Sequence, residues 1–375
     1  MGRMIDRNIG QEQPANFWIN FPLFSIQWCF PTLLGRHRAC KTGRMLSTEM
    51  NVIEYEGFGS PEVLHMCQRP LPQPGSNEVL IKVTAAGVNR ADILQRKGKY
   101  PPPPGASDIL GMEISGVIAA LGAQTTRWII GQRVCALLIS GGYGEYVAVD
   151  ERLCLPVPEK ISMLEAAGLM EALATVYANI FESAGLRSGE TVLVHGGSSG
   201  IGHIAIQMIK QFGASVLVTV ANAEKAEFCH KLGADFTAIY TQEDFVETAQ
   251  KATAGRGVDI VLDMIGGDYL NRNLTALGFK GRHVSIATQH GAKAEIDMRL
   301  VMQKQLTLTG STLRGRSLAE KARLIAEIGE KMGPSVAAGR IKPFIYQSFP
   351  LKNAAEAHKM MESGAHMGKI VLEVS

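Results

Sequence analysis

Short apolar runs, rich in β-branched residues, alternate with amphipathic stretches through the second half of the chain. The runs expected as strands are Thr191–Val194, Ser215–Val220, Phe236–Tyr240, Val258–Met264, His283–Ala287 and Leu306–Gly310. The stretches expected as helices are Ile201–Phe212, Ala223–Leu232, Glu243–Lys251 and Tyr269–Leu277. Strands this apolar suit a parallel sheet that is covered on both faces and joined by right-handed crossovers. The pattern therefore predicts an α/β domain with a Rossmann-type, doubly wound parallel sheet.

The chain before Thr191 has a different pattern, in which dense Gly and Pro clusters separate short runs. The runs expected as strands are Val52–Tyr55, Glu78–Val88, Ile114–Leu121, Arg133–Ile139 and Tyr146–Val149, followed by a helical stretch over Met163–Ala184. After Gly310, a helix is expected over Leu318–Lys331 and strands over Ile345–Pro350 and Gly368–Val374. A mostly-β section ahead of a βαβ section indicates two domains.

The expected domain boundaries follow from these patterns. Residues 49–170 form the mostly-β domain, residues 171–312 form the nucleotide-binding domain, and residues 313–375 return to the first domain. Residues 1–48 are expected to lie outside the fold, because their composition differs from that of the rest of the chain.

The first 48 residues allow two interpretations. Polar residues and prolines interrupt the apolar stretch Phe17–Leu34, which argues against a membrane anchor. The basic stretch Arg36–Arg44 is compatible with a presequence and a mitochondrial location. Alternatively, translation starts at Met45 or Met50 and the upstream stretch is never made. We expect the second case, a cytoplasmic protein that is not bound to a membrane.

Composition narrows the class of protein further. With 375 residues, of which 46% are hydrophobic and 19% charged, the chain is long and apolar enough for two globular domains. The formal charge of +3 comes from the first 48 residues, which carry +4, while the remainder carries −1. This distribution indicates no dedicated nucleic-acid surface. The six cysteines lack close metal-ligand spacing, which favours free thiols in a reduced compartment.

A glycine-rich turn joins the strand at Thr191 to the helix that begins at Ile201. The turn consists of Gly196, Gly197, Ser198, Ser199, Gly200, Ile201 and Gly202. Glycines let the backbone approach a ligand closely, and the first helical N–H groups then point at phosphates from the positive end of the helix dipole. His203 follows Gly202 where a triphosphate-binding loop requires lysine, so the turn favours a dinucleotide.

Two further patterns exclude one enzyme class and favour one dinucleotide. Short-chain dehydrogenases have a similar turn but need a tyrosine with lysine four positions later, which Tyr240, Tyr269 and Tyr346 lack. The segment Thr219–Lys225 has no acidic residue at the strand tip and a lysine near it, which favours NADPH over NADH. Loops after the later strands are expected to complete the cofactor pocket with Gly266, Ile286, Ala287, Thr288, Ser311, Thr312 and Leu313.

Five more segments, in the order in which they follow one another along the chain, indicate a known protein family. They are Gly87–Asp92, Lys99–Pro103, Gly111–Glu113, Gly142–Tyr146 and Asp263–Gly267. With the domain order, they resemble the zinc-free quinone oxidoreductase branch of the medium-chain dehydrogenase/reductase superfamily, and most closely a group that includes bacterial NADPH:quinone reductases. The resemblance runs from about residue 51 to residue 375. It implies a GroES-like, mostly-β catalytic domain beside the Rossmann domain.

The resemblance also bears on metal content. Zinc alcohol dehydrogenases of this superfamily have a cysteine where Asn89 stands and a histidine where Met112 stands, both as metal ligands. Asparagine and methionine do not suit catalytic zinc, which needs about three protein ligands, and the four-cysteine structural site is missing too. We therefore expect no metal, and hydride transfer to an acceptor that is already electron-poor.

The resemblance assigns roles to individual side chains. Asn89 and Thr175 would lie near the nicotinamide ribose and ring. Tyr100 would line the acceptor site, which makes Tyr100 and Asn89 the candidate catalytic residues. Lys225 and Tyr240 would hold the 2′-phosphate of NADPH.

The expected function is an NADPH-dependent quinone oxidoreductase that acts by hydride or single-electron transfer, mainly through positioning. Asn222, where relatives often have serine, is a further candidate cofactor contact. Two alternatives stay open: reduction of an enone or 2-enoyl thioester with NADPH, and an NADPH-binding protein with little turnover that acts structurally or binds RNA. The expected partner is a small electrophilic molecule, and the family implies a homodimer.

Overall fold

The computed structural model describes residues 48–374. The extension expected over residues 1–48 lies outside the described residues except for Thr48, whose carbonyl oxygen accepts a hydrogen bond from the N–H of Leu71 at 2.9 Å. Within the described part, no helix is both long and apolar enough to cross a membrane. The cysteines described there are all free thiols: Cys67, Cys135, Cys154 and Cys229.

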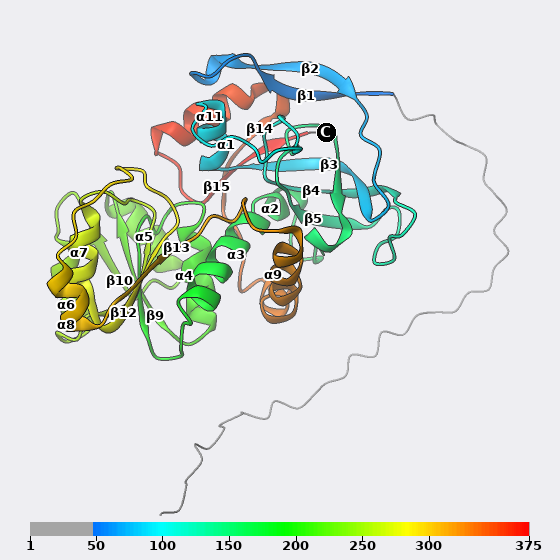
Figure 1. Ribbon diagram of the computed structural model, residues 1–375. Coiled ribbons are helices and arrows are strands. Elements are labelled where there is room, and N and C mark those ends of the chain that lie inside the picture. The colour runs from blue at the N-terminus through cyan, green and yellow to red at the C-terminus, as the bar shows by residue number, and fades with distance from the viewer. Residues whose placement is uncertain (1–47, 375) are drawn as a thin grey trace, which may run out of the picture. The chain divides into compact units, whose positions relative to one another are not determined.

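One sheet combines strands from early and late parts of the chain. Its strands are β3 (Glu78–Val88), β4 (Glu113–Leu121), β5 (Arg133–Leu137), β6 (Tyr146–Asp150), β7 (Cys154–Pro156), β14 (Ile345–Pro350) and β15 (Lys369–Glu373). They follow the order β14-β15-β3-β4-β5-β7, and β6 also pairs with β3. β15 runs antiparallel to β3 with Ile370 opposite Val88, so the C-terminal strand lies beside an early one (Figure 1).

A two-stranded ribbon and several helices accompany this sheet. β1 (Glu49–Tyr55) and β2 (Leu64–Pro70) pair with each other in antiparallel fashion. The helices are α1 (Arg90–Arg96), α2 (Met163–Ala167), α9 (Leu318–Lys331), α10 (Gly333–Ala337) and α11 (Ala354–Ser363). The sequence pattern does not predict β2 or α1, because β2 is largely exposed and α1 has only seven residues, too few to show helical periodicity.

The second sheet is parallel throughout, in the order β10-β9-β8-β11-β12-β13. Its strands are β8 (Thr191–Val194), β9 (Ser215–Val220), β10 (Phe236–Ile239), β11 (Val258–Asp263), β12 (Leu277–Ser285) and β13 (Thr307–Gly310). This order is that of a doubly wound nucleotide-binding sheet. The predicted fold class, a Rossmann-type sheet with a separate mostly-β domain, is confirmed, while the exact domain boundaries stay predictions.

Helices cover both faces of the parallel sheet (Figure 1). They are α4 (Gly202–Gln211), α5 (Ala223–Lys231), α6 (Phe245–Ala252), α7 (Tyr269–Ala276) and α8 (Met298–Lys304). Leu193 and Leu217 pack in one buried cluster with Phe245 of α6, whereas Val192 packs in another with Ile204 of α4. Alternate side chains of a strand point to opposite faces, which explains why these strands are apolar at every position.

The strand β12 differs from its prediction. It begins at Leu277, whereas the apolar pattern predicts a start at His283. Lys280 has a φ of 58°, and the register against β11 shifts between Val258 and Ile260. This irregularity and the charged residues before His283 interrupt the apolar pattern, so a search for apolar runs does not find the first part of the strand.

The predicted helical stretch Met163–Ala184 is divided into three parts. α2 ends at Ala167, α3 covers Met170–Val176, and a π-helical segment covers Tyr177–Ser183. Such π-helical turns are frequent near functional sites. At the start of α3, the N–H of Glu171 donates a hydrogen bond to Glu113 of β4, in the mostly-β domain.

Candidate active site

The loops predicted to bind the cofactor lie at one edge of the parallel sheet. Because all six strands run in the same direction, their carboxyl ends and the loops that follow meet at that edge. The predicted residues there are Gly196 to Gly202 after β8, Asn222 and Lys225 after β9, Tyr240 after β10, Gly266 after β11, Ile286 to Thr288 after β12, and Ser311 to Leu313 after β13.

The glycine turn is packed tightly against the start of α4. Gly196 has a φ of 66°, a conformation that favours glycine. A Cβ atom at Gly202 would lie 2.3 Å from the carbonyl oxygen of Gly196. Ser199 Oγ accepts the N–H of Gly202 at 3.0 Å, and the carbonyl oxygen of Ser198 accepts the N–H of Gly368 at 2.8 Å. The turn is thereby fixed on both sides.

A buried polar network supports the glycine turn and the loop after β11. The His195 ring contacts Thr219 Oγ1 at 3.0 Å and Asn273 Oδ1 at 2.7 Å. Asn273 Nδ2 donates to Asp263 Oδ2 at 3.1 Å, and Asp263 Oδ1 accepts the N–H of Gly266 at 3.2 Å. Two of the loops expected to face the cofactor are therefore held by one network.

Basic and hydrogen-bonding groups gather beyond the tip of β9. Asn222 Oδ1 accepts the N–H of Lys225 at 3.0 Å and caps α5, and Lys225 Nζ donates to the carbonyl oxygen of Gly364 at 2.6 Å. The nearby His366 has a buried Nδ1 without a hydrogen-bond partner, and burial together with the charge of Lys225 lowers its pKa to about 4. Tyr240, after the neighbouring strand, is 47% exposed. This set of donors fits a phosphate group.

A buried cluster ties the mostly-β domain to the start of α3. Lys369 Nζ lies 2.7 Å from Asn89 Oδ1 and 2.5 Å from Glu113 Oε1. Asn89 Nδ2 donates to the same Glu113 oxygen at 2.9 Å, and the other oxygen accepts the N–H of Glu171 at 3.0 Å. The side chains of Lys369 and Glu113 are 1% and 0% exposed. Asn89 is therefore held in one orientation by a buried ion pair.

Thr175 and Tyr100 lie near this cluster. The Thr175 hydroxyl donates to Glu171 Oε1 at 3.0 Å. The ring of Tyr100 faces Arg314, with 5.3 Å between the ring centroid and the guanidinium carbon, and the carbonyl oxygen of Tyr100 accepts a hydrogen bond from Arg314 at 3.3 Å. Burial raises the pKa of the Tyr100 hydroxyl.

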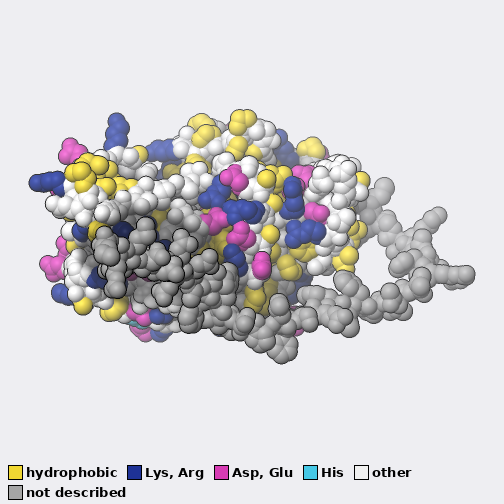
Figure 2. Space-filling view, turned by 60° about the horizontal axis from the view of Figure 1, so that its bottom comes forward, with side chains coloured by type: hydrophobic (Ala, Val, Ile, Leu, Met, Phe, Trp, Pro, Cys, Tyr) yellow, Lys and Arg dark blue, Asp and Glu magenta, His cyan; other side chains and the backbone are white. Residues whose placement is uncertain are grey.

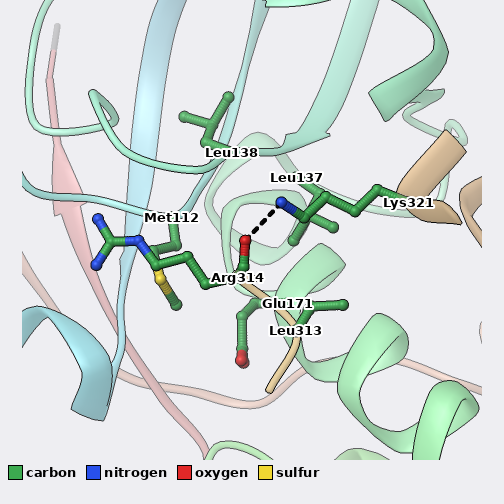
Figure 3. Close-up of a pocket in the computed structure, with 7 residues that line it drawn as sticks. All are labelled: Met112, Leu137, Leu138, Glu171, Leu313, Arg314 and Lys321. Carbon is green, nitrogen blue, oxygen red and sulfur yellow. Dashed lines mark hydrogen bonds between the residues drawn. The ribbon is translucent and has the colours of Figure 1, made fainter. Parts of the chain in front are cut away.

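A small pocket opens next to these residues. Its lining consists of Met112, Leu137, Leu138, Glu171, Leu313, Arg314 and Lys321. Figure 3 shows Glu171 beside Leu313 on one side, with Leu138 across the pocket. Lys321 Nζ donates to the carbonyl oxygen of Arg314 at 2.7 Å. The walls are mainly apolar with a few polar groups.

The predicted residues thus fall into two regions, the sheet edge and the pocket region, and Leu313 belongs to both. Ser311 points elsewhere: its Oγ donates to Asn179 Oδ1 in the π-helical segment at 2.9 Å. Sequence reasoning missed Glu113, Glu171, Arg314 and Lys369. Glu171 lies one helical turn before Thr175, a spacing that could have identified it.

The residues present do not fit catalytic zinc. Asn89 and Met112 stand at the two positions where the resemblance places metal ligands. The amide of Asn89 is hydrogen-bonded to Lys369, whose ammonium group is itself a cation at this place. Among residues 48–374, no group of three or more His, Cys, Asp or Glu side chains could hold a metal ion. The metal-free expectation stays a prediction.

Comparison with known proteins gives matches along most of the chain. Residues 75–159 match the alcohol dehydrogenase GroES-like domain family, and residues 200–327 match the zinc-binding dehydrogenase family. The quinone oxidoreductase of Rattus norvegicus is 31% identical over 334 residues, which cover 88% of this chain and 99% of the rat protein.

Solved structures give similar results. The crystal structure of Escherichia coli quinone oxidoreductase complexed with NADPH has a TM-score of 0.78 and 30% identity, covering 86% of this chain and 100% of that chain. A crystal structure of an NAD-dependent alcohol dehydrogenase has a TM-score of 0.76 and 30% identity, covering 87% of this chain and 100% of that chain.

Proposed function

Because the chain belongs to the quinone oxidoreductase branch of the medium-chain dehydrogenase/reductase superfamily, we propose that it is an NADPH-dependent quinone oxidoreductase that works without a metal. The protein is an oxidoreductase of this superfamily with a nicotinamide cofactor. The observation that carries the finer proposal is the buried cluster of Lys369, Glu113 and Asn89. A site with a lysine ammonium in place of a Lewis acid suits an acceptor that is already electron-poor, such as a quinone.

The main predicted residues have separate tasks in this proposal. The glycine turn and the first N–H groups of α4 bind the pyrophosphate, and Lys225 and Tyr240 bind the 2′-phosphate. Asn89 and Thr175 orient the nicotinamide, which supplies a hydride when the cofactor is bound. Tyr100 and the apolar pocket walls hold the acceptor and exclude water, so that the rate enhancement comes mainly from positioning.

A panel of donors and acceptors tests the function directly. NADPH and NADH oxidation would be measured with ortho- and para-quinones, an enone and a 2-enoyl-CoA. We expect the fastest turnover with NADPH and a quinone. Reduction of the 2-enoyl-CoA alone would overturn the quinone assignment and favour an alkene reductase.

The panel also addresses a binding protein with little turnover. Salt-dependent binding of RNA without NADPH oxidation would support that alternative. On the described part of the face in Figure 2, basic and acidic side chains are interspersed. Such a mixed surface favours an enzyme over an RNA-binding protein.

Replacing Lys225 with alanine tests the choice of cofactor. We expect the KM for NADPH to rise roughly 10- to 100-fold, the effect of losing a hydrogen bond to a charged group, while the KM for NADH barely changes. Steady-state kinetics with both cofactors measure this difference. Lys231→Ala is the matched control, because Lys231 lies on the same helix and pairs with Glu227 instead. Equal effects of Lys225→Ala on both cofactors would contradict the phosphate role.

A homodimer is part of the proposal. β13 is the outer strand of the parallel sheet, and the adjoining β12 and α8 carry Phe279 and Met302, which are 63% and 66% exposed. Apolar side chains beside an open sheet edge support pairing with a second copy of the chain.

A further inference from the structure

One carboxyl group beside the pocket has no role in the proposal above. Glu171 is the second residue of α3, and its side chain lines the pocket beside Leu313 (Figure 3). Its Oε1 accepts the hydroxyl hydrogen of Thr175 at 3.0 Å, and its N–H is held by Glu113 at 3.0 Å. Since Thr175 is the residue expected beside the nicotinamide, we expect Glu171, its hydrogen-bond partner, to lie near the point where the acceptor is reduced.

The surroundings of Glu171 hold opposing charges. The charged and titratable groups that face it are Lys369 from β15, Glu113 from β4, Asp92 from α1, Tyr100 after α1, Arg314 after β13 and Lys321 from α9. Burial raises the pKa of Glu171 to about 7, with Lys369 acting against this shift and Glu113 adding to it. A carboxyl group that titrates near neutral pH can both give up and regain a proton during turnover.

Tyr100, the candidate from sequence, is less suited to this task. Burial raises the pKa of its hydroxyl further above the ordinary tyrosine value, so it holds its proton more strongly. The guanidinium of Arg314 faces its ring, which favours a role in shaping the pocket.

We propose that Glu171 is the general acid that protonates the acceptor oxygen during quinone reduction, an inference that rests on the proposed function. The quinone takes a hydride, with both of its electrons, from NADPH and one proton from Glu171. The O–H bond of Glu171 breaks and an O–H bond to the quinone oxygen forms, which gives the hydroquinone, NADP⁺ and the Glu171 carboxylate. The Thr175 hydroxyl and the nearby Lys369 charge stabilise that carboxylate, which regains a proton from water.

The variant E171Q keeps the size of the side chain and removes its acidic proton. We expect kcat for 1,4-benzoquinone at pH 7 to fall about 100-fold, the usual loss for a general acid, with an unchanged KM for NADPH. In the wild-type protein, kcat falls as pH rises through the pKa of Glu171, because the carboxylate cannot donate. E171Q lacks this alkaline fall. Glu165→Gln, on α2 and outside the pocket, is the matched control and keeps the wild-type profile.

A second acceptor separates proton delivery from structural damage. Tetrachloro-1,4-benzoquinone yields far less basic oxygens on reduction, so it depends less on an acid, and E171Q slows it less than 1,4-benzoquinone. Equal slowing of both quinones, or wild-type rates in E171Q, would overturn the role of Glu171.

Two further outcomes are informative. If E171Q does not fold, the wild-type profiles decide: an alkaline fall with 1,4-benzoquinone alone supports the proposal, and the same fall with both quinones contradicts it. If the wild-type protein reduces neither quinone while it reduces another acceptor, the proposed function fails, and the inference fails with it.

Discussion

Lys369→Met is expected to lower the free energy of unfolding by about 3–5 kcal/mol, because it leaves the Glu113 carboxylate buried without its counter-charge. The two side chains are 1% and 0% exposed, so water cannot take the place of the ammonium group. Asn89 loses the partner of its Oδ1 as well. Urea-induced unfolding of the wild-type and variant proteins measures the difference.

Two further variants identify the buried charge as the cause. The double variant K369M/E113Q removes both charges and is expected to recover much of the lost stability. Lys231→Met breaks the ion pair with Glu227, whose side chains are 72% and 68% exposed, and should leave the free energy of unfolding almost unchanged, because water screens exposed ion pairs. A loss in Lys369→Met no larger than in Lys231→Met would contradict this account of the cluster.

Gly202→Ala is expected to lower the free energy of unfolding by about 1–3 kcal/mol, the usual range for overpacking, and to weaken NADPH binding strongly. The added Cβ atom would lie 2.3 Å and 2.6 Å from the carbonyl oxygens of Gly196 and Gly197. Backbone atoms on both sides cannot move as a flexible side chain can, so the turn itself must shift. Fluorescence titration with NADPH and urea unfolding measure the two effects.

Gly333→Ala makes the same chemical change where there is room for it. Gly333 is a helical residue at the start of α10, and a Cβ atom there would meet nothing within 4 Å. Alanine is favoured over glycine in a helix by about 1 kcal/mol or less, so this variant should be as stable as the wild-type protein and bind NADPH equally well. Normal NADPH binding by Gly202→Ala would show that the turn tolerates movement.

Much of the parallel sheet could be predicted because its signals are local. β8 and α4 follow directly from an apolar run, a glycine turn and an amphipathic stretch. For β12 the apolar pattern predicts a start at His283, six residues after its true start at Leu277, because the first half of the strand contains Lys280 in a left-handed conformation. Local patterns find regular elements, and they miss elements that depend on pairing with neighbours.

The candidate site also contains some residues that local sequence patterns predict and others that depend on the folded structure. The glycine turn and Lys225 occupy places that strand order alone determines, so sequence could propose them. The contact of Lys369 with Glu113 joins residues 256 positions apart, and it depends on the pairing of β15 with β3. The role proposed for Glu171 depends on its burial and on the pocket that its side chain helps to line, and neither can be known before the chain folds.

The pairing of β15 with β3 also affects how the protein is made. Ile370 is synthesised about 280 residues after Val88, its partner across the two strands. At ~5–20 residues per second, the ribosome needs roughly 15–55 s for that stretch. During that time the edge of β3 that later pairs with β15 is unpaired, while the nucleotide-binding domain is still being synthesised. That edge is where a chaperone would bind the growing chain and where a truncated product would aggregate.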